Sequence, residues 1–323
     1  MAQAKGSDFQ FMVIEEATYG TTPGTPSGYI IPVSSIGGDW FTRRLIDNPE
    51  LRGNRNAAAP VRGNVSVNGS AQFPLHMDAT GWILKHAVGE PDTSGTGPYT
   101  HVMKCNYSGT TENEDIPVGL TIEHGHVGIG QYHSFTGCRI NTLTINATSE
   151  GVAILDVGFM GQDYDQDTSS LDAAPTSYSL TAVDHFAVSN IEEGGGAKTN
   201  ITDLSFTLSN NLDGSQYCVG SSGQIGALPS GLATVTGTFQ ALFEDDTYLT
   251  KGENHTESSL MIKWAQGTAS LQLDLPEIVY EPASPAVTGP AGVLVRMNFR
   301  SYYANHADKT VLKATLVNSV SAY

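Results

Sequence analysis

The sequence predicts an all-β fold with one or two short helices, built from two copies of one unit. Gly, Ser and Thr are abundant, and only 15% of the residues are charged, which is typical of β-proteins with many turns. Polar and apolar residues alternate through several segments, as they do in half-buried strands. One alternating segment occurs twice, and a duplicated β-rich unit favours symmetric assembly over a single catalytic cleft.

The duplicated segment has the pattern Val-x-Gly-x-x-Gln. Its two copies lie within residues 63–75 and 231–243. An aspartate follows each copy, Asp78 in the first half and the pair Asp245–Asp246 in the second, and is placed to start a helix. A strand, a long loop, the repeated strand, a helix and a closing strand recur in the same order, which indicates an internal duplication.

In the first half, the strand Val65–Leu75 has apolar odd positions and mostly polar even positions. A short helix follows, which Asp78 is expected to cap and Gly89 to end. The expected inward face of this helix consists of Trp82, Ile83, His86 and Ala87. The remaining expected elements are an N-terminal strand, the strand Ile36–Leu45, the irregular connection Asp47–Pro60, and the strands Tyr99–Asn106, Gly119–Val127, Gln131–Thr148 and Gly151–Met160.

The second half is expected to follow the first after a polar linker rich in Asp, Ser and Thr, which begins at Gly161. Its strands are predicted at Thr199–Ser209, Thr234–Phe243, Leu260–Ala265, Ala269–Tyr280, Val293–Phe299 and Thr310–Val317, with a helix over Asp246–Lys251 and a long loop over Asn210–Ser230. The closing strands of the two halves align Asp156 with Arg296. The predicted organisation is therefore a first repeat at 1–165, a linker at 166–185 and a second repeat at 186–323.

The charge and the cysteines exclude several classes of protein. The formal net charge is −17, so tight binding of DNA through its phosphates is not expected. Three widely spaced cysteines without a CxxC pair argue against a disulfide framework or a zinc site, and buried free thiols are expected instead. The beginning of the chain lacks a hydrophobic signal core, so synthesis in a cytoplasm is expected, with export only inside a larger particle.

No residue constellation predicts catalysis, a metal or a cofactor. His124 and His126 project from one face of a strand near His133, but two histidines on an ordinary strand surface explain the pattern better than a metal site. The alternating acidic run Asp163–Asp167 lacks the glycine and glutamate of a calcium loop, which favours a solvated linker. Gly220–Gly223 lies in a loop and lacks the strand–turn–helix context of a nucleophilic serine. The chain is therefore predicted not to be an enzyme.

Several segments resemble the tail tube proteins of tailed bacteriophages, in particular the family whose members carry two tube units. The first is the run from Glu15 to Pro23, Glu-Glu-Ala-Thr-Tyr-Gly-Thr-Thr-Pro, which follows a strand. The others are Asn48–Arg55 with the spaced glycines Gly63 and Gly69, Gly97–His101 after the helix, and Tyr132–Cys138 before a strand. The resemblance covers most of the first half closely and the second half more loosely.

The resemblance implies a β-sandwich or barrel unit whose sheets join between subunits into a closed ring. Such joining pairs the open sheet edges that would otherwise promote aggregation. Stacked rings form a tail tube that conducts double-stranded DNA into the host cell. Three double units match the geometry of six single ones, so a homotrimer is expected, with a homohexamer as the alternative. Tail terminator, tape measure and baseplate or tip proteins are the implied partners, with assembly in the host cytoplasm.

Two sets of residues are candidates for the surfaces of such a tube. Polar residues facing the lumen would let DNA pass without holding its phosphates, although the same face could instead contact another protein in the stack. The lumen candidates are Ser66, Asn68, Ser70, Gln72, Asp156, Thr234, Thr236, Thr238 and Gln240. The long loops are candidates for contacts between rings, through Asn48, Glu50, Arg52, Asn54, Asp213 and Gln216. The alternatives are another virion protein, such as a decoration or tail terminator protein, or a carbohydrate-binding β-sandwich with aromatic stacking platforms.

Overall fold

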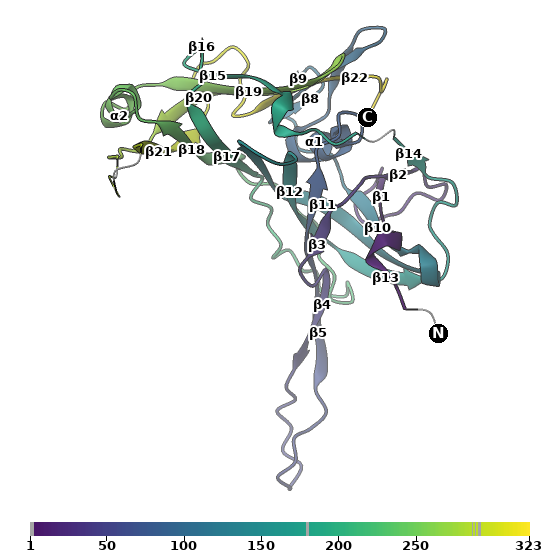
Figure 1. The fold of residues 1–323 in the computed structure, drawn as a ribbon. Helices are drawn as coiled ribbons and strands as arrows, with labels where there is room; N and C mark the ends of the chain where they lie inside the picture. Colours follow the sequence, from purple (N-terminus) through teal and green to yellow (C-terminus); the bar gives the residue numbers. More distant parts are fainter. Residues whose placement is uncertain (1–2, 179–180, 286, 288, 290–291) are drawn as a thin grey trace.

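The computed structural model describes residues 3–178, 181–285, 287, 289 and 292–323. Strands dominate the fold, and the described chain contains two short α-helices, so the all-β prediction is confirmed. Figure 1 shows two outer sheets on either side of a central layer, and a long two-stranded arm that leaves the body.

The central layer is antiparallel and runs in the order β5–β12–β11–β17–β18–β21. Two short strands, β3 and β4, follow one another along the outer edge of β5. The bounds of these strands are β3 (Ser35–Gly37), β4 (Phe41–Ile46), β5 (Val61–Pro74), β11 (Gln131–Thr148), β12 (Ile154–Gly161), β17 (Ile201–Ser209), β18 (Thr234–Leu242) and β21 (Leu294–Ser301). The strands of both halves of the chain therefore lie side by side in one layer.

Each outer sheet is joined to the central layer by one strand that belongs to both. β11 starts in the first outer sheet, which also holds β1 (Phe9–Glu15), β2 (Gly28–Ile30), β10 (Leu120–His126), β13 (Asp163–Asp167) and β14 (Thr176–Ser177). β20 (Ala269–Tyr280) starts in the second, which also holds β6 (Asp92–Ser94), β7 (Tyr99–Lys104), β15 (Val188–Glu193), β16 (Gly196–Ala197), β19 (Ser258–Gln266) and β22 (Lys313–Asn318). The remaining elements are the hairpin of β8 (Tyr107–Ser108) and β9 (Thr111–Glu112), and three short 3-10 turns at Gly6–Asp8, Val127–Ile129 and His185–Ala187.

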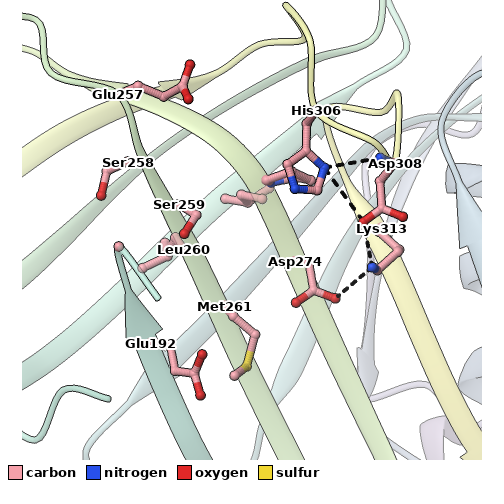
Figure 2. A pocket seen from close by; sticks show the side chains of 13 residues that line it. Glu192, Glu257, Ser258, Ser259, Leu260, Met261, Asp274, His306, Asp308 and Lys313 are labelled. Carbon is pink, nitrogen blue, oxygen red and sulfur yellow. Dashed lines mark hydrogen bonds and ion pairs between the residues drawn. The ribbon is translucent and has the colours of Figure 1, made fainter. Parts of the chain in front are cut away.

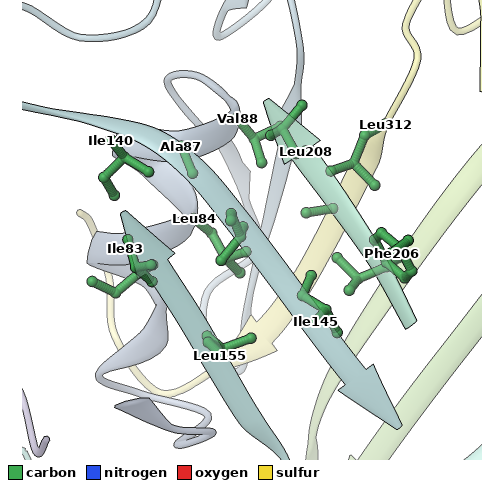
Figure 3. Close-up of a cluster of buried hydrophobic side chains, with 14 of the residues drawn as sticks. Ile83, Leu84, Ala87, Val88, Ile140, Ile145, Leu155, Phe206, Leu208 and Leu312 are labelled. Carbon is green, nitrogen blue, oxygen red and sulfur yellow. The ribbon is translucent and has the colours of Figure 1, made fainter. Parts of the chain in front are cut away.

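The helix α1 (Thr80–Val88) lies under the central layer and is buried on every side. Figure 3 shows its apolar side chains against those of β11, β12 and β17, among them Ile145, Leu155 and Phe206. Full burial of each such side chain contributes about 1.5–3 kcal/mol. The expected one-sided helix is therefore wrong. Its cap is also corrected, because the helix begins after Ala79 rather than Asp78, while Gly89 ends it as expected. The second helix, α2, spans Thr247–Glu253.

The glycine of the repeated pattern has the same role in both copies. A Cβ on Gly69 would lie 2.1 Å from the Trp40 ring, and a Cβ on Gly237 would lie 2.4 Å from the Phe299 ring. An aromatic ring therefore covers the backbone at each glycine, where any side chain would collide. The inward turn of Trp40 also interrupts the expected strand Ile36–Leu45, which the structure divides into β3 and β4.

The expected strands Gln131–Thr148 and Ala269–Tyr280 are confirmed with the same bounds. The linker expectation is wrong at Asp163–Asp167, which forms β13 and pairs with β11. Residues 179 and 180 of that expected linker lie outside the described residues. One thiol also differs from expectation, because Cys105 and Cys138 are buried but Cys218 is exposed.

The two halves pair their strands in the same register. Gln72 lies opposite Asp156 across β5 and β12, and Gln240 lies opposite Arg296 across β18 and β21. On the other side of the same strands, Ser35 lies opposite Gln72 and Asp203 opposite Gln240. The halves also share sheets, since β11 pairs with β17 and β22 pairs with β7. The repeat boundaries in the sequence stay a prediction.

Candidate lumen and assembly surfaces

The nine lumen candidates lie on one face of the central layer. Along β5, Val65, Val67 and Ala71 point into the core, whereas the candidates between them point outward. The same alternation places Asp156 on that face of β12, and the four threonine and glutamine candidates on that face of β18. The structure thus brings together residues that are far apart in the sequence, because the strands that carry them are neighbours in one layer.

A row of hydrogen bonds crosses this polar face from β3 to β17. Gln72 Nε2 donates to Asp156 Oδ1 at 2.6 Å, and Ser35 Oγ donates to Gln72 Oε1 at 2.9 Å. Asn146 Nδ2 donates to Asp156 Oδ2 at 3.0 Å, and Ser205 Oγ donates to Asn146 Oδ1 at 2.7 Å. Among the described residues no cation pairs with Asp156. The row fixes the polar side chains in place and leaves a negative charge facing outward.

Two arginines that are not among the lumen candidates also lie on this face. Arg296 and Arg300 of β21 line a hollow of about 490 Å³ together with residues of β17 and β18. Arg300 Nη2 lies 3.2 Å from Glu281 Oε1, and Arg296 Nη2 lies 3.4 Å from Thr238 Oγ1. The alternation of β21 places both arginines on this face, because Val295, Met297 and Phe299 are buried and Arg296, Asn298 and Arg300 alternate with them.

Both ends of the central layer are open edges. Beyond β5, the strands β3 and β4 pair with no further strand in the described chain. At the other end, β21 pairs with β18 along its whole length, but its outer side pairs with β20 only at Phe299, Arg300 and Ser301. Unpaired backbone groups at a sheet edge favour pairing with another chain. The layer is therefore suited to extension by further copies at each end.

The arm seen at the bottom of Figure 1 consists of residues 41–66, which comprise β4, the loop 47–60 and the first part of β5. It holds five of the sixteen basic residues of the chain and two of the thirty-three acidic ones, so it carries a formal charge of +3 and the rest of the chain −20. Leu45, Ile46, Leu51 and Val61 of the arm are among the exposed large apolar residues. A basic and partly apolar arm is complementary in charge to an acidic surface such as the body of this chain.

The loop candidates occupy two different environments. Asn48, Glu50, Arg52 and Asn54 lie in the arm, where Arg52 Nη2 contacts Glu50 Oε2 at 2.5 Å and Asn54 Oδ1 accepts from the Asn56 amide. Asp213 and Gln216 lie in the second loop and hydrogen-bond to each other. That loop is folded back rather than projecting, because the Gly223 carbonyl accepts from the Val65 amide at 2.8 Å and Ile225 and Leu228 are buried.

Figure 2 shows a hollow of about 530 Å³ on the exposed side of the second outer sheet. Four carboxylates line it, those of Glu192, Glu257, Asp274 and Asp308. Lys313 Nζ lies 2.7 Å from Asp308 Oδ2 and 4.0 Å from Asp274 Oδ2. Burial alone would raise the pKa of Asp308, but hydrogen bonds from Lys313 and Lys104 lower it. Four carboxylates against one lysine leave the lining of the hollow acidic overall.

The histidine prediction needs correction, because His124 is buried and not on the surface. Its ring packs among Phe9, Phe11, Trp40 and Phe135 at centroid distances between 4.5 and 5.4 Å. Its Nε2 has no hydrogen-bond partner among the described residues. Burial, reinforced by the neighbouring His133 and His126, lowers the pKa of His124 to about 3. In the described part of the chain no group of three or more His, Cys, Asp or Glu residues is placed to hold a metal.

This buried histidine predicts a loss of stability in acid. In the unfolded chain, His124 binds a proton below the ordinary histidine pKa of 6.5. In the folded chain, His124 does so only at about pH 3. The free energy of unfolding should therefore fall by about 1.4 kcal/mol per pH unit between these values on account of this residue. Urea titrations of His124→Phe and of the unchanged chain from pH 7 to 4 measure the difference. Parallel pH profiles of the two proteins would contradict the assignment.

The three tryptophans do not form a binding platform. Trp40, Trp82 and Trp264 have exposed fractions of 6%, 4% and 1%. Trp82 Nε1 donates to the Tyr178 hydroxyl at 2.8 Å, so its polar atom is satisfied inside the protein. The carbohydrate-binding alternative needs exposed aromatic rings, which these three tryptophans do not supply.

The fold and its surfaces define a class of structural β-protein, with a central layer that is polar on one face and open at both edges. A family model described as phage tail tube protein matches residues 6–301. The chain belongs to the phage tail tube protein family and is a structural protein of the virion tail. Membership of this family implies that copies of the chain assemble with one another into the tail tube and contact other tail components. No curated protein matches the sequence. Neither helix of the described chain is long and apolar enough to cross a membrane.

Proposed function

We propose that three copies of this chain close into a ring with pseudo-sixfold symmetry, and that the rings stack into a tube through which double-stranded DNA passes. The observation that supports this most is the central layer, which places two halves of matching register side by side and ends in two open edges. Joining the edges between copies satisfies the unpaired backbone groups, and closing the ring removes both edges.

The polar face of the central layer is proposed to be the lumen wall. Hydroxyl and amide groups dominate it, and Asp156 adds a negative charge without a cation partner in the described chain. Such a surface does not retain phosphates as a lysine-rich surface would. Arg296 and Arg300 lie on the same face; Glu281 pairs with Arg300 and offsets its charge, and Arg296 contacts Thr238 Oγ1.

The arm is proposed to join consecutive rings. Its loop 47–60 has no strand pairing and reaches beyond the body (Figure 1). The arm is basic and the rest of the chain is acidic, so the arm of one ring is attracted to the body of the next. The second loop, with Asp213 and Gln216, supports the base of the arm. Tail terminator, tape measure and baseplate or tip proteins would contact the ends or the bore of the same tube, assembled in the host cytoplasm.

Native mass spectrometry of soluble rings tests the stoichiometry. One chain has a mass of 34.2 kDa, so the proposal expects a species of three chains, about 103 kDa. Low protein concentration favours single rings over stacks by mass action. A ring of six chains would refute the threefold arrangement.

Positive charge on the lumen wall should slow DNA passage. Lysine at the matched positions Asn68, Ser70, Thr236 and Thr238 adds four charges per chain, each of which can hold a phosphate. Phage particles with this fourfold variant should form tails of normal length but release DNA at least about tenfold more slowly at low salt, with recovery at high salt. Release kinetics followed by a DNA-binding dye measure the effect. Glutamine at the same four positions is the matched control, and undiminished release from the lysine variant would contradict the lumen assignment.

A further inference from the structure

The junction between the two halves inside one chain provides a template for the junction between chains. The second part of β11 lies between β12 and β17, so Leu143 is opposite Val157 on one side and Leu208 on the other. Leu143 and Leu208 are both buried. This contact joins β11 of the first half to β17 of the second half within the central layer.

The same elements occur at the two open edges. In the second half, Tyr280 lies opposite Phe299 as Ile140 lies opposite Phe159 in the first, so β20 corresponds to β11 with a shift of 140 residues. The chain beyond Tyr280 starts along β21, because the Glu281 amide donates to the Asn298 carbonyl at 2.9 Å. In the first half, by contrast, β11 continues past this point to Thr148.

The opposite edge carries the counterpart of β17. Phe41 of β4 lies opposite Val67, and Leu208 of β17 lies opposite Val235, the matching position of the repeated strand. Likewise Ile36 of β3 lies opposite Ala71, and Leu204 lies opposite Phe239. Hence β3 and β4 together correspond to β17. On the side where β17 pairs with β11, β3 and β4 pair with no strand of the described chain.

Transferring the internal register to the two edges pairs specific residues. The pair Leu143–Leu208 becomes Ala283–Phe41, and the pair Ala147–Leu204 becomes Val287–Ile36. Each transferred pair consists of two apolar residues, as the internal pairs do. Phe41 is 36% exposed and Val287 is 75% exposed in the single chain, so pairing would cover apolar surface that is now open to water.

The prolines of this segment agree with the transferred register. Pro285 corresponds to Ile145 and would lie opposite the break between β3 and β4 at Gly38–Trp40, where β5 has no ladder partner on the side of β3 and β4. Pro282 corresponds to Thr142, next to the register shift that already follows Ile140 in β11. Proline lacks a backbone donor and is tolerated where the ladder is interrupted.

We infer that a second copy of this chain pairs with the first in this register, with Ala283 opposite Phe41 and Val287 opposite Ile36 of the neighbour. The inference rests on the proposed ring and specifies its contact residue by residue. Within one chain these residues lie at opposite ends of the central layer, separated by at least six strand spacings of roughly 4.8 Å, or about 29 Å measured along the layer. Any direct contact between them is therefore intermolecular.

Cysteine cross-linking tests the register. Two proteins are mixed, one with Ala283→Cys and one with Phe41→Cys, both with Cys218→Ser so that only buried native thiols remain. Directly opposite residues in antiparallel strands have Cα separations suited to a disulfide. Mild oxidation should give a covalent dimer at least fivefold faster than the control mixture, in which Arg43→Cys on the same strand replaces Phe41→Cys. The pair Val287→Cys and Ile36→Cys repeats the test at the other predicted contact.

Electron microscopy of the same samples separates the two proposals. Tubes with the expected cross-links support both. If tubes form but the Arg43→Cys mixture cross-links as fast as the Phe41→Cys mixture, the register is overturned and the proposed tube still stands. The same holds if tubes form and neither predicted pair cross-links. Samples with neither tubes nor cross-links would overturn the register and the proposed function together.

Discussion

Replacing residues 47–60 by a two-residue Asn-Gly turn should leave rings that do not polymerise into tubes. The loop has no strand pairing, and Ile46 and Val61 already pair at its base, so a short hairpin can close there. The change removes Arg52 and Arg55 together with the exposed Leu51, which are available to a neighbouring ring. Negative-stain micrographs should show single rings in place of long filaments. The mass of the assembled particles should fall at least about a hundredfold.

The control for this deletion separates assembly from folding. Since nearly every residue of the loop is exposed, the midpoint of thermal unfolding should change by no more than a few degrees. A second variant with Glu at Arg44, Arg52, Arg55 and Arg62 keeps the arm but reverses its charge, and it should also stop stacking at low salt. Tubes of normal length from the deletion variant would end the assignment of the arm to ring stacking.

Proline at position 296 should prevent ring closure. The Asn298 carbonyl points to the outer edge of β21, where the Glu281 amide donates to it, so the Arg296 amide two residues earlier points to the same edge. Proline removes that donor, so the segment after Tyr280 of the same chain cannot continue along β21 and present the edge with which the neighbour pairs, while the ladder to β18 is kept. Each junction should weaken by about 3 kcal/mol, roughly a hundredfold in its association constant. Sedimentation velocity should then show single chains at concentrations that give rings of the unchanged protein.

The matched control is Arg296→Ala, which removes the side chain but keeps the amide donor. This variant should form rings, because the side chain contacts only Thr238 at 3.4 Å in the described chain. Proline at the corresponding Asp156 is a contrast, since β12 has partners on both sides and the chain should fail to fold. Rings of normal stability from Arg296→Pro would show that the outer edge of β21 is not used.

Local patterns predicted the strands and the polar face because alternation is a property of neighbouring residues. The even positions of β5 and β18 could be assigned to one face from their sequence alone, and the register of the two halves matches at Gln72 and Gln240. The all-polar strand Asp163–Asp167 was missed, since only its pairing with β11 makes it a strand. The helix α1 was misjudged for a similar reason, because burial on every side depends on distant elements such as Tyr323, whose ring lies beside Gly81.

The assembly surfaces were predictable only in part. Loop length indicated that residues 47–60 and 210–230 were unusual, but not that the first projects while the second folds against Val65. The open edges depend on which strands lack partners, which is settled by pairing across the whole chain. The sequence alone aligns Arg296 with Asp156, but the place of Arg296 on the polar face depends on the pairing of β21 with β18.

Electron microscopy of the purified full chain, with image averaging along the filaments, tests the central claim most directly. The account predicts hollow tubes whose rings contain three chains and six sheet units, with the face that carries Ser70 and Thr238 lining the bore. Filaments without a bore, or rings in which the two halves of the chain do not occupy equivalent positions around the axis, would contradict it.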